Sequence, residues 1–109
     1  MSEQNMSVTL EQDRAVIALV GEHEAYTADK LAKQLSALLS EGVSVTVDLR
    51  HTIFVDSTVV GVLLAARRRA DDSETSFELV LGPTTGWPVL RILEVTGVAE
   101  HLDAHIAEQ

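Results

Sequence analysis

The feature that most constrains the fold is the switch between strand-like and helix-like hydrophobic spacing along the chain. Residues 15–20 (AVIALV) form a nearly continuous apolar run, as expected of a strand inside a sheet. Residues 27–42 carry a helical stripe of leucines, namely Leu31, Leu35, Leu38 and Leu39. Residues 43–50 (VSVTVDLR) then alternate strictly, which predicts a strand with one covered face and one more polar face. This alternation of strands and helices favours an α/β fold with parallel crossovers and packed helices.

The remaining segments extend the alternation in both directions. Residues 6–12 should pair with residues 15–20 as a hairpin, because the polar residues EQDR between them are typical of a turn. A deeply packed helix should follow Asp56, and residues 77–82 predict a further strand. Residues 87–98 predict the last helix, and residues 101–106 fit either an edge strand or a helical tail. A chain of 109 residues has the length of one domain, which we expect to span residues 1–109.

Several residues mark the expected ends of these helices. Thr27 is placed to cap the first helix, and Gly42 suits the left-handed position after its end. In the last helix, Pro88 suits the first helical position and Gly97 suits the stop. The buried stripe of that helix should consist of Val89, Ile92, Leu93 and Thr96.

Composition and charge argue against several classes of protein. The chain carries 17 acidic and 8 basic residues, a formal charge of −9, which disfavours direct binding to nucleic acid or to an anionic membrane. Its one basic cluster, Arg67 to Arg69, is expected to face solvent late in a helix. The first eight residues do not resemble a signal peptide, and no apolar run is long enough to span a bilayer, so we expect a cytoplasmic location.

The sequence offers little for catalysis or metal binding. Cysteine is absent, and the four histidines His23, His51, His101 and His105 are not in a ligand spacing, so they are expected at the surface or at caps. Ser57 lacks the surroundings of a hydrolase nucleophile, and no nucleotide-binding loop is present. We therefore expect a protein that is not an enzyme and has no cofactor or metal. A small-molecule site would require converging polar groups, and no such set is evident.

The triplet Asp56–Ser57–Thr58 is the one polar cluster in front of a long apolar run. Any of the three side chains could cap the following helix, and capping requires only one of them. The other two would then lie at an exposed helix N-terminus, where free N–H groups and the helix dipole favour a phosphate group. The residues alone leave two interpretations open, a simple helix cap and a phosphorylation switch.

Four segments together resemble a STAS domain of the anti-sigma factor antagonist type. They are the opening hairpin, GEHEAYTADKL beside the family's G-E-L-D-x-x-T-A, VDLRHTIFVDSTVVGVLL beside D-L-S-x-V-x-F-x-D-S-[ST]-G-L-G-V-L-L, and LEVTGV beside L-x-x-[ST]-G-L. The resemblance covers nearly the whole chain. It implies a mixed sheet of four to five strands with helices packed mainly on one face.

The resemblance also implies a function. Ser57 matches the family's phosphoacceptor, and the partners would be an anti-sigma factor with serine kinase activity and a phosphatase. The unphosphorylated form would bind the kinase, and the phosphorylated form would be released. The implied partner surface contains His23, Glu24, Tyr26, Asp56, Thr58, Val59 and Gly61. Whether the chain forms a homodimer is left open.

Two positions depart from the family pattern. Val59 stands where the family has glycine, which predicts added bulk in the first helical turn near the approaching partner. Glu24 replaces the motif aspartate and is longer by one methylene. The Val59 departure motivates an alternative function, a STAS adaptor that is not phosphorylated and docks on a transporter ATPase or a stress-signalling complex.

Overall fold

The computed structural model describes residues 5–98 and the backbone of residues 103–106. Six strands and three helices occupy these residues. The strands are β1 (Asn5–Glu11), β2 (Arg14–His23), β3 (Ser44–Asp48), β4 (Thr52–Val55), β5 (Phe77–Leu81) and β6 (Asp103–Ile106). The helices are α1 (Ala25–Ser40), α2 (Ser57–Ser73) and α3 (Trp87–Thr96).

The strands form a mixed sheet, as the resemblance implied, and five of them follow the order β1-β2-β3-β5-β6. The predicted hairpin is confirmed, since β1 and β2 are antiparallel, and β2, β3, β5 and β6 run parallel to one another. The tail around residues 101–106 takes the strand alternative in part, as β6 at the edge of the sheet, while His101 lies outside the described residues.

The short strand β4 was not predicted from the sequence. It pairs in parallel with the last residues of β2, away from the main strand order. Its residues Ile53, Phe54 and Val55 are β-branched or aromatic and suit a strand. A segment of four residues is too short to show a period of its own, so only its pairing with β2 identifies it.

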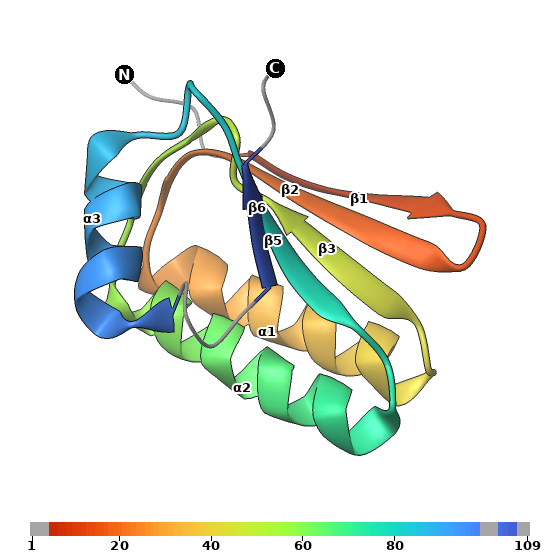
Figure 1. Ribbon diagram of the computed structural model, residues 1–109. Helices are drawn as coiled ribbons and strands as arrows, with labels where there is room; N and C mark the ends of the chain where they lie inside the picture. Colours follow the sequence, from red (N-terminus) through yellow and green to blue (C-terminus); the bar gives the residue numbers. More distant parts are fainter. Residues whose placement is uncertain (1–4, 99–102, 107–109) are drawn as a thin grey trace.

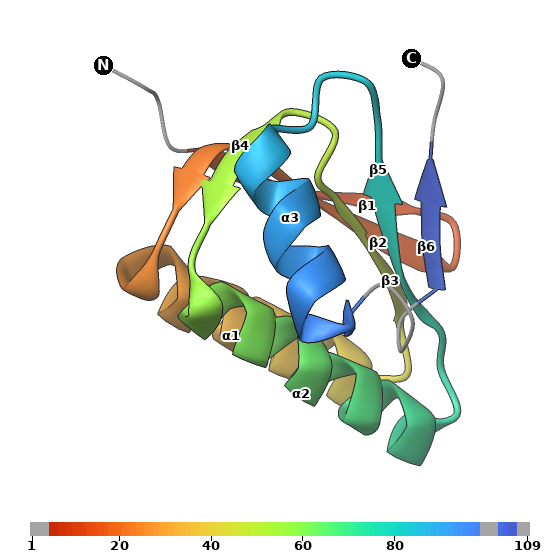
Figure 2. The ribbon, with the colours of Figure 1, turned by 60° about the vertical axis from the view of Figure 1, so that its left-hand side comes forward.

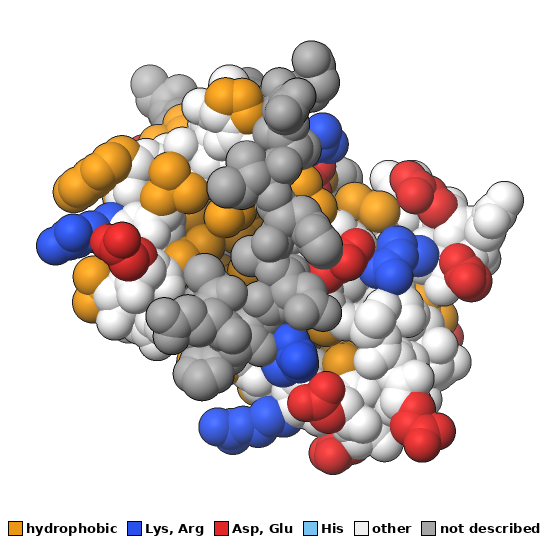
Figure 3. Space-filling view, viewed as in Figure 1, with side chains coloured by type: hydrophobic (Ala, Val, Ile, Leu, Met, Phe, Trp, Pro, Cys, Tyr) orange, Lys and Arg blue, Asp and Glu red, His pale blue; other side chains and the backbone are white. Residues whose placement is uncertain are grey.

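The helices lie on one face of the sheet, as expected. Figures 1 and 2 show α1 and α2 side by side beneath the strands, with α3 standing alongside β4. The core between these layers is apolar, and Ile17, Leu31, Leu35, Leu63 and Leu79 are among its buried members. Outside it, apolar side chains remain exposed over α3, on the left of Figure 3, and they include Trp87 and Leu90. Within the described residues, no helix is long and apolar enough to cross a bilayer.

The more polar face of β3 is covered. Thr46 is only 6% exposed, because Arg14 donates to its hydroxyl at 2.8 Å and the hydroxyl donates to Glu78 at 3.0 Å. Asp48 is also buried, and Arg50 donates to both of its carboxylate oxygens, which lowers the pKa of Asp48. Polar side chains on this face therefore pair with each other and do not point freely into water.

Two details of the helices differ from expectation. Thr27 is the third residue of α1 and not its cap, since the helix begins two residues earlier, after Glu24. The Thr27 hydroxyl accepts the Glu24 N–H at 3.1 Å, so it still satisfies a donor of the helix start. Thr96 is exposed, and its hydroxyl donates to the Ile92 carbonyl. Gly42 and Gly97 do adopt the predicted left-handed conformation, with φ of 79° and 74°.

Candidate functional site

Helix α2 begins with a side-chain cap supplied by Asp56. One oxygen of its carboxylate, Oδ1, accepts the N–H of Thr58 at 3.0 Å and the N–H of Val59 at 3.2 Å. The Thr58 hydroxyl donates to the same oxygen. Such caps typically stabilise a helix by about 1 kcal/mol. Capping in the triplet therefore occupies Asp56 and Thr58.

Ser57 is left free by this arrangement. It is the first residue of α2 and is exposed, and its hydroxyl makes no hydrogen bond with any residue that the structure describes. The Thr58 hydroxyl is also exposed but is held by the capping carboxylate. Of the two hydroxyls at the helix start, only that of Ser57 is available without breaking the cap.

The end of β2 lies directly beside this helix start. The Asp56 N–H donates to the His23 carbonyl at 3.3 Å, and His23 pairs with Val55 in the short parallel ladder between β2 and β4. Glu24 follows as the cap residue of α1, and Tyr26 is 73% exposed with the Lys30 ammonium over its ring. The structure thus brings the segment 23–26 next to Asp56 and Ser57.

The expected surface position of His23 is wrong. Its side chain is only 1% exposed, and its Nε2 lies 2.9 Å from the Val20 carbonyl oxygen. A carbonyl only accepts, so Nε2 carries the proton, and Nδ1 is buried with no hydrogen-bond partner among residues 5–98. Burial lowers the pKa of His23, because the charged imidazolium would lose its hydration. The His23 side chain is therefore buried next to the start of α2, and its ring is not exposed on the surface.

This burial predicts that acid weakens the fold through His23. In the unfolded chain the imidazole has its ordinary pKa near 6.5, so it takes up a proton before the folded chain does. The free energy of unfolding should therefore fall as the pH drops from about 7 towards the folded pKa, by at most about 1.4 kcal/mol per pH unit for one proton. Thermal melting between pH 7.5 and 5.5 measures this, and His23→Gln should show a smaller loss. An equal loss in both proteins would assign the acid sensitivity to other groups.

Val59 also differs from expectation. The sequence predicted added bulk on the partner surface, whereas its side chain is 0% exposed and belongs to the core. The branched residue therefore fills space under the helix and leaves the outer surface of the first turn unchanged. Gly61, by contrast, is exposed, and a Cβ added there would meet no atom within 4 Å. The alternative of an adaptor that is not phosphorylated was motivated by the bulk of Val59 on the surface. Because Val59 is buried, this argument for the adaptor no longer holds.

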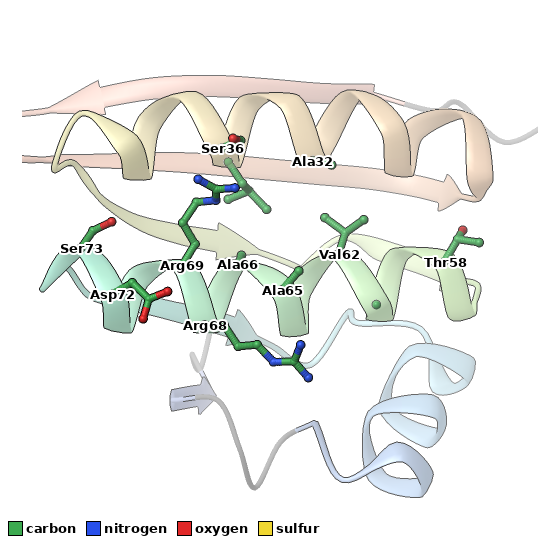
Figure 4. Close-up of a pocket in the computed structure, with 12 residues that line it drawn as sticks. Ala32, Ser36, Thr58, Val62, Ala65, Ala66, Arg68, Arg69, Asp72 and Ser73 are labelled. Atoms are coloured by element: carbon green, nitrogen blue, oxygen red, sulfur yellow. The ribbon is translucent and has the colours of Figure 1, made fainter.

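A groove between α1 and α2 was missed by the sequence analysis. It has a volume of about 780 Å³, and Thr58 lies at one of its ends. Small side chains line much of it, namely Ala32 and Ser36 from α1 and Gly61 and Ala65 from α2. Arg68 and Arg69 line it farther along α2 (Figure 4). The three arginines were noted in the sequence, but only the packing of two helices distant in sequence creates the groove.

The described residues contain no group of three or more histidine, aspartate or glutamate side chains placed to hold a metal ion. His51 lies in the loop after β3, where one of its ring nitrogens is 3.1 Å from the Thr84 hydroxyl. The side chains of His101 and His105 lie outside the described part of the structure.

Comparison with known proteins gives a consistent result. The chain is 29% identical over 103 residues to the anti-sigma-B factor antagonist of Listeria monocytogenes, which covers 91% of this chain and 88% of that protein. It shares its fold with an anti-sigma factor antagonist from Mycobacterium paratuberculosis (TM-score 0.79, 18% identity, 94% and 86% of the two chains). The same holds for the Bacillus cell fate determinant SpoIIAA in its phosphorylated form (TM-score 0.76, 16% identity, 96% and 93%).

The decisive match is to a protein family. Residues 6–105 match the sequence profile of the family described as "Mlab, STAS domain". The match begins within β1 and ends within β6, and it contains all three helices and the Asp56–Ser57–Thr58 helix start. The chain therefore belongs to the STAS domain family.

Proposed function

We propose that this protein is an anti-sigma factor antagonist that binds an anti-sigma factor with serine kinase activity and is released when Ser57 is phosphorylated. The observation that carries the proposal is the exposed Ser57 hydroxyl at the start of α2, which makes no hydrogen bond among the described residues and lies beside a capped helix N-terminus. Two likenesses support it. The curated Listeria relative is an anti-sigma-B factor antagonist, and SpoIIAA, whose fold this chain shares, has been solved in a phosphorylated form.

The physical basis of the switch is a large change of charge at a place that tolerates it structurally. A phosphate on Ser57 would add about −1.5 to −2 charges. The N–H groups and dipole of α2 favour an anion there, while the Asp56 carboxylate opposes it. The fold should therefore survive phosphorylation, and the surface potential around Ser57 should change strongly.

We assign the partner surface to the exposed residues around Ser57. Glu24, Tyr26, Thr58 and Gly61 are exposed on the two helix starts and on the second turn of α2. Asp56 holds the helix start in place, and His23 and Val59 act as buried supports. A phosphatase would return the protein to its binding form.

The test is phosphorylation by a purified anti-sigma factor kinase of the host with ATP, followed by mass spectrometry. The wild-type chain should gain a single phosphate on Ser57, because only that hydroxyl is free of the cap. Ser57→Ala should gain none, whereas Thr58→Val keeps the shape of the side chain and should still be modified.

Two results would contradict the proposal. One is phosphate on the Ser57→Ala chain at the wild-type rate. The other is an unmodified wild-type chain with every such kinase of the host, combined with recovery of a transporter ATPase in a pull-down, which would favour the adaptor function instead.

A further inference from the structure

We propose that the groove between α1 and α2 docks an acidic helix of the anti-sigma factor, held at its far end by Arg68 and Arg69. This inference rests on the proposed function and extends the contact area from the surface around Ser57, with which the groove shares Thr58 and Gly61, along α2 to the arginines. Its grounds are the shape of the groove, its continuity with the Ser57 surface and the charges that line it.

The shape of the groove suits a helix. Ala32 and Ser36 are spaced by one helical turn on α1, as are Gly61 and Ala65 on α2, so small side chains lie along both walls. Small side chains let another helix approach closely, and an amphipathic helix laid in a groove is a common mode of recognition. Gly61 lies in the interior of α2, where glycine is a poor helix former. A Cβ added there would meet no atom within 4 Å, so packing inside the protein does not require a glycine at this position.

The groove continues the proposed partner surface. Thr58, which follows Ser57, lies at one of its ends, and Arg69 lies eleven residues farther along α2 (Figure 4). At 1.5 Å per residue this distance is roughly 16 Å, which three turns of a docked helix would span. A partner contacting Ser57 could therefore extend one helix along the groove to the arginines.

The charges of the protein point to an acidic occupant. Five of its eight cations form ion pairs, which are Arg14–Glu78, Lys33–Asp29, Arg50–Asp48, Arg67–Asp71 and Arg91–Glu94. Lys30 lies over the Tyr26 ring.

Arg68 and Arg69 remain, and neither forms an ion pair with a carboxylate among residues 5–98. Figure 4 shows Arg69 reaching towards α1 and Arg68 leaving α2 on the other side. Among the residues that the structure describes, Arg69 donates only to the Ser40 hydroxyl, at 3.4 Å, and Asp72 is the one acid in the lining of the groove. Both arginines line the groove, with the Arg69 side chain directed across it towards α1, and in a chain of charge −9 these cations fit carboxylates supplied by a partner.

The first test reverses these charges in the full chain. The double variant Arg68→Glu/Arg69→Glu should bind the purified anti-sigma factor at least about tenfold more weakly than the wild-type chain does. Raising the salt concentration should reduce this difference in affinity, because salt screens the charges. Arg91→Glu changes an exposed arginine on α3 in the same way and should bind within about twofold of wild type. Isothermal titration calorimetry measures the affinities.

The second test fills the groove without harming the helix. Gly61→Leu should weaken binding about tenfold while the melting temperature stays at or above that of wild type, because leucine is a better helix former than glycine. Ala37→Leu, on an exposed part of α1 outside the groove, is the matched control and should bind normally.

The outcomes separate this inference from the proposed function. If the wild-type chain binds the anti-sigma factor and the groove variants bind equally well, the groove is overturned and the Ser57 switch stands. If the wild-type chain binds no anti-sigma factor of its host, both proposals fail. Weakened binding of the arginine and Gly61 variants, with normal binding of both controls, supports the groove.

Discussion

Phosphorylation of Ser57 should weaken binding to the anti-sigma factor about a hundredfold, and Ser57→Asp should weaken it about tenfold. These losses correspond to about 2.7 and 1.4 kcal/mol of binding free energy. The phosphate has the larger effect because it carries about two charges, whereas aspartate carries one. Ser57 is exposed at the first residue of α2 and next to the Asp56 carboxylate, so each added charge meets the partner directly and is not neutralised by a neighbouring cation in the cap. Titration calorimetry with the unphosphorylated, phosphorylated and variant chains gives the three affinities.

The control for this prediction adds the same charge elsewhere. Gln34→Glu lies on an exposed position of α1 outside the groove, so its affinity should stay within about twofold of wild type. The melting temperatures of Ser57→Asp and wild type should also agree closely, since an acid is favourable in the first turn of a helix. Full affinity of the phosphorylated chain would rule out release by phosphorylation.

Gly86→Ala should cause the largest loss of stability of any single methyl addition considered for this chain. A Cβ at position 86 would lie 2.2 Å from the Ile53 carbonyl oxygen and 2.7 Å from the Ile53 carbonyl carbon. These are backbone atoms, and the Gly86 N–H also donates to the Thr52 carbonyl at 2.7 Å, so neither segment can move without breaking the contact between β4 and α3. Overpacking of this kind costs about 3 kcal/mol, which for a domain of this size lowers the melting temperature by on the order of 15 °C.

A second glycine provides the control for steric crowding. Gly61→Ala places a Cβ where no atom lies within 4 Å, in the interior of an exposed helix face. It should raise the free energy of unfolding by about 0.5–1 kcal/mol, because alanine loses less conformational entropy in a helix than glycine. Thermal melting of both variants under one condition measures the contrast. If Gly86→Ala melts like wild type, the close contact between residue 86 and β4 does not exist in solution.

Much of the fold could be predicted because its elements carry their own patterns. The leucine stripe of α1, the strict alternation around β3 and the hairpin of β1 and β2 are visible within windows of ten to fifteen residues. The glycines after α1 and α3 adopt the predicted left-handed conformation, since that choice depends only on the local backbone. Strand β4 could not be predicted, because its four residues form a strand only by pairing with the end of β2.

The candidate site also combines features that the sequence could predict with features that it could not. The Asp56–Ser57–Thr58 helix start is local, so the sequence indicated a cap within the triplet and exposed polar side chains beside it, and the structure assigned the cap to Asp56. The orientation of Val59 depends on which side of α2 meets the core, and the burial of His23 depends on where β2 ends beneath α2. The sequence-based interpretation placed both side chains on the outer surface, whereas both are buried close to the start of α2.

By itself, the sequence determined the identity of the elements other than β4 and the presence of a helix cap within residues 56–58, because each depends on residues within one or two helical turns. Only the tertiary structure decided which of the eight suggested site residues are exposed and which are buried. It also created the groove between α1 and α2, whose walls come from segments more than twenty residues apart. The physical reason is that side-chain burial and surface shape are set by packing between distant segments, and the local periodicity of one segment does not contain that information.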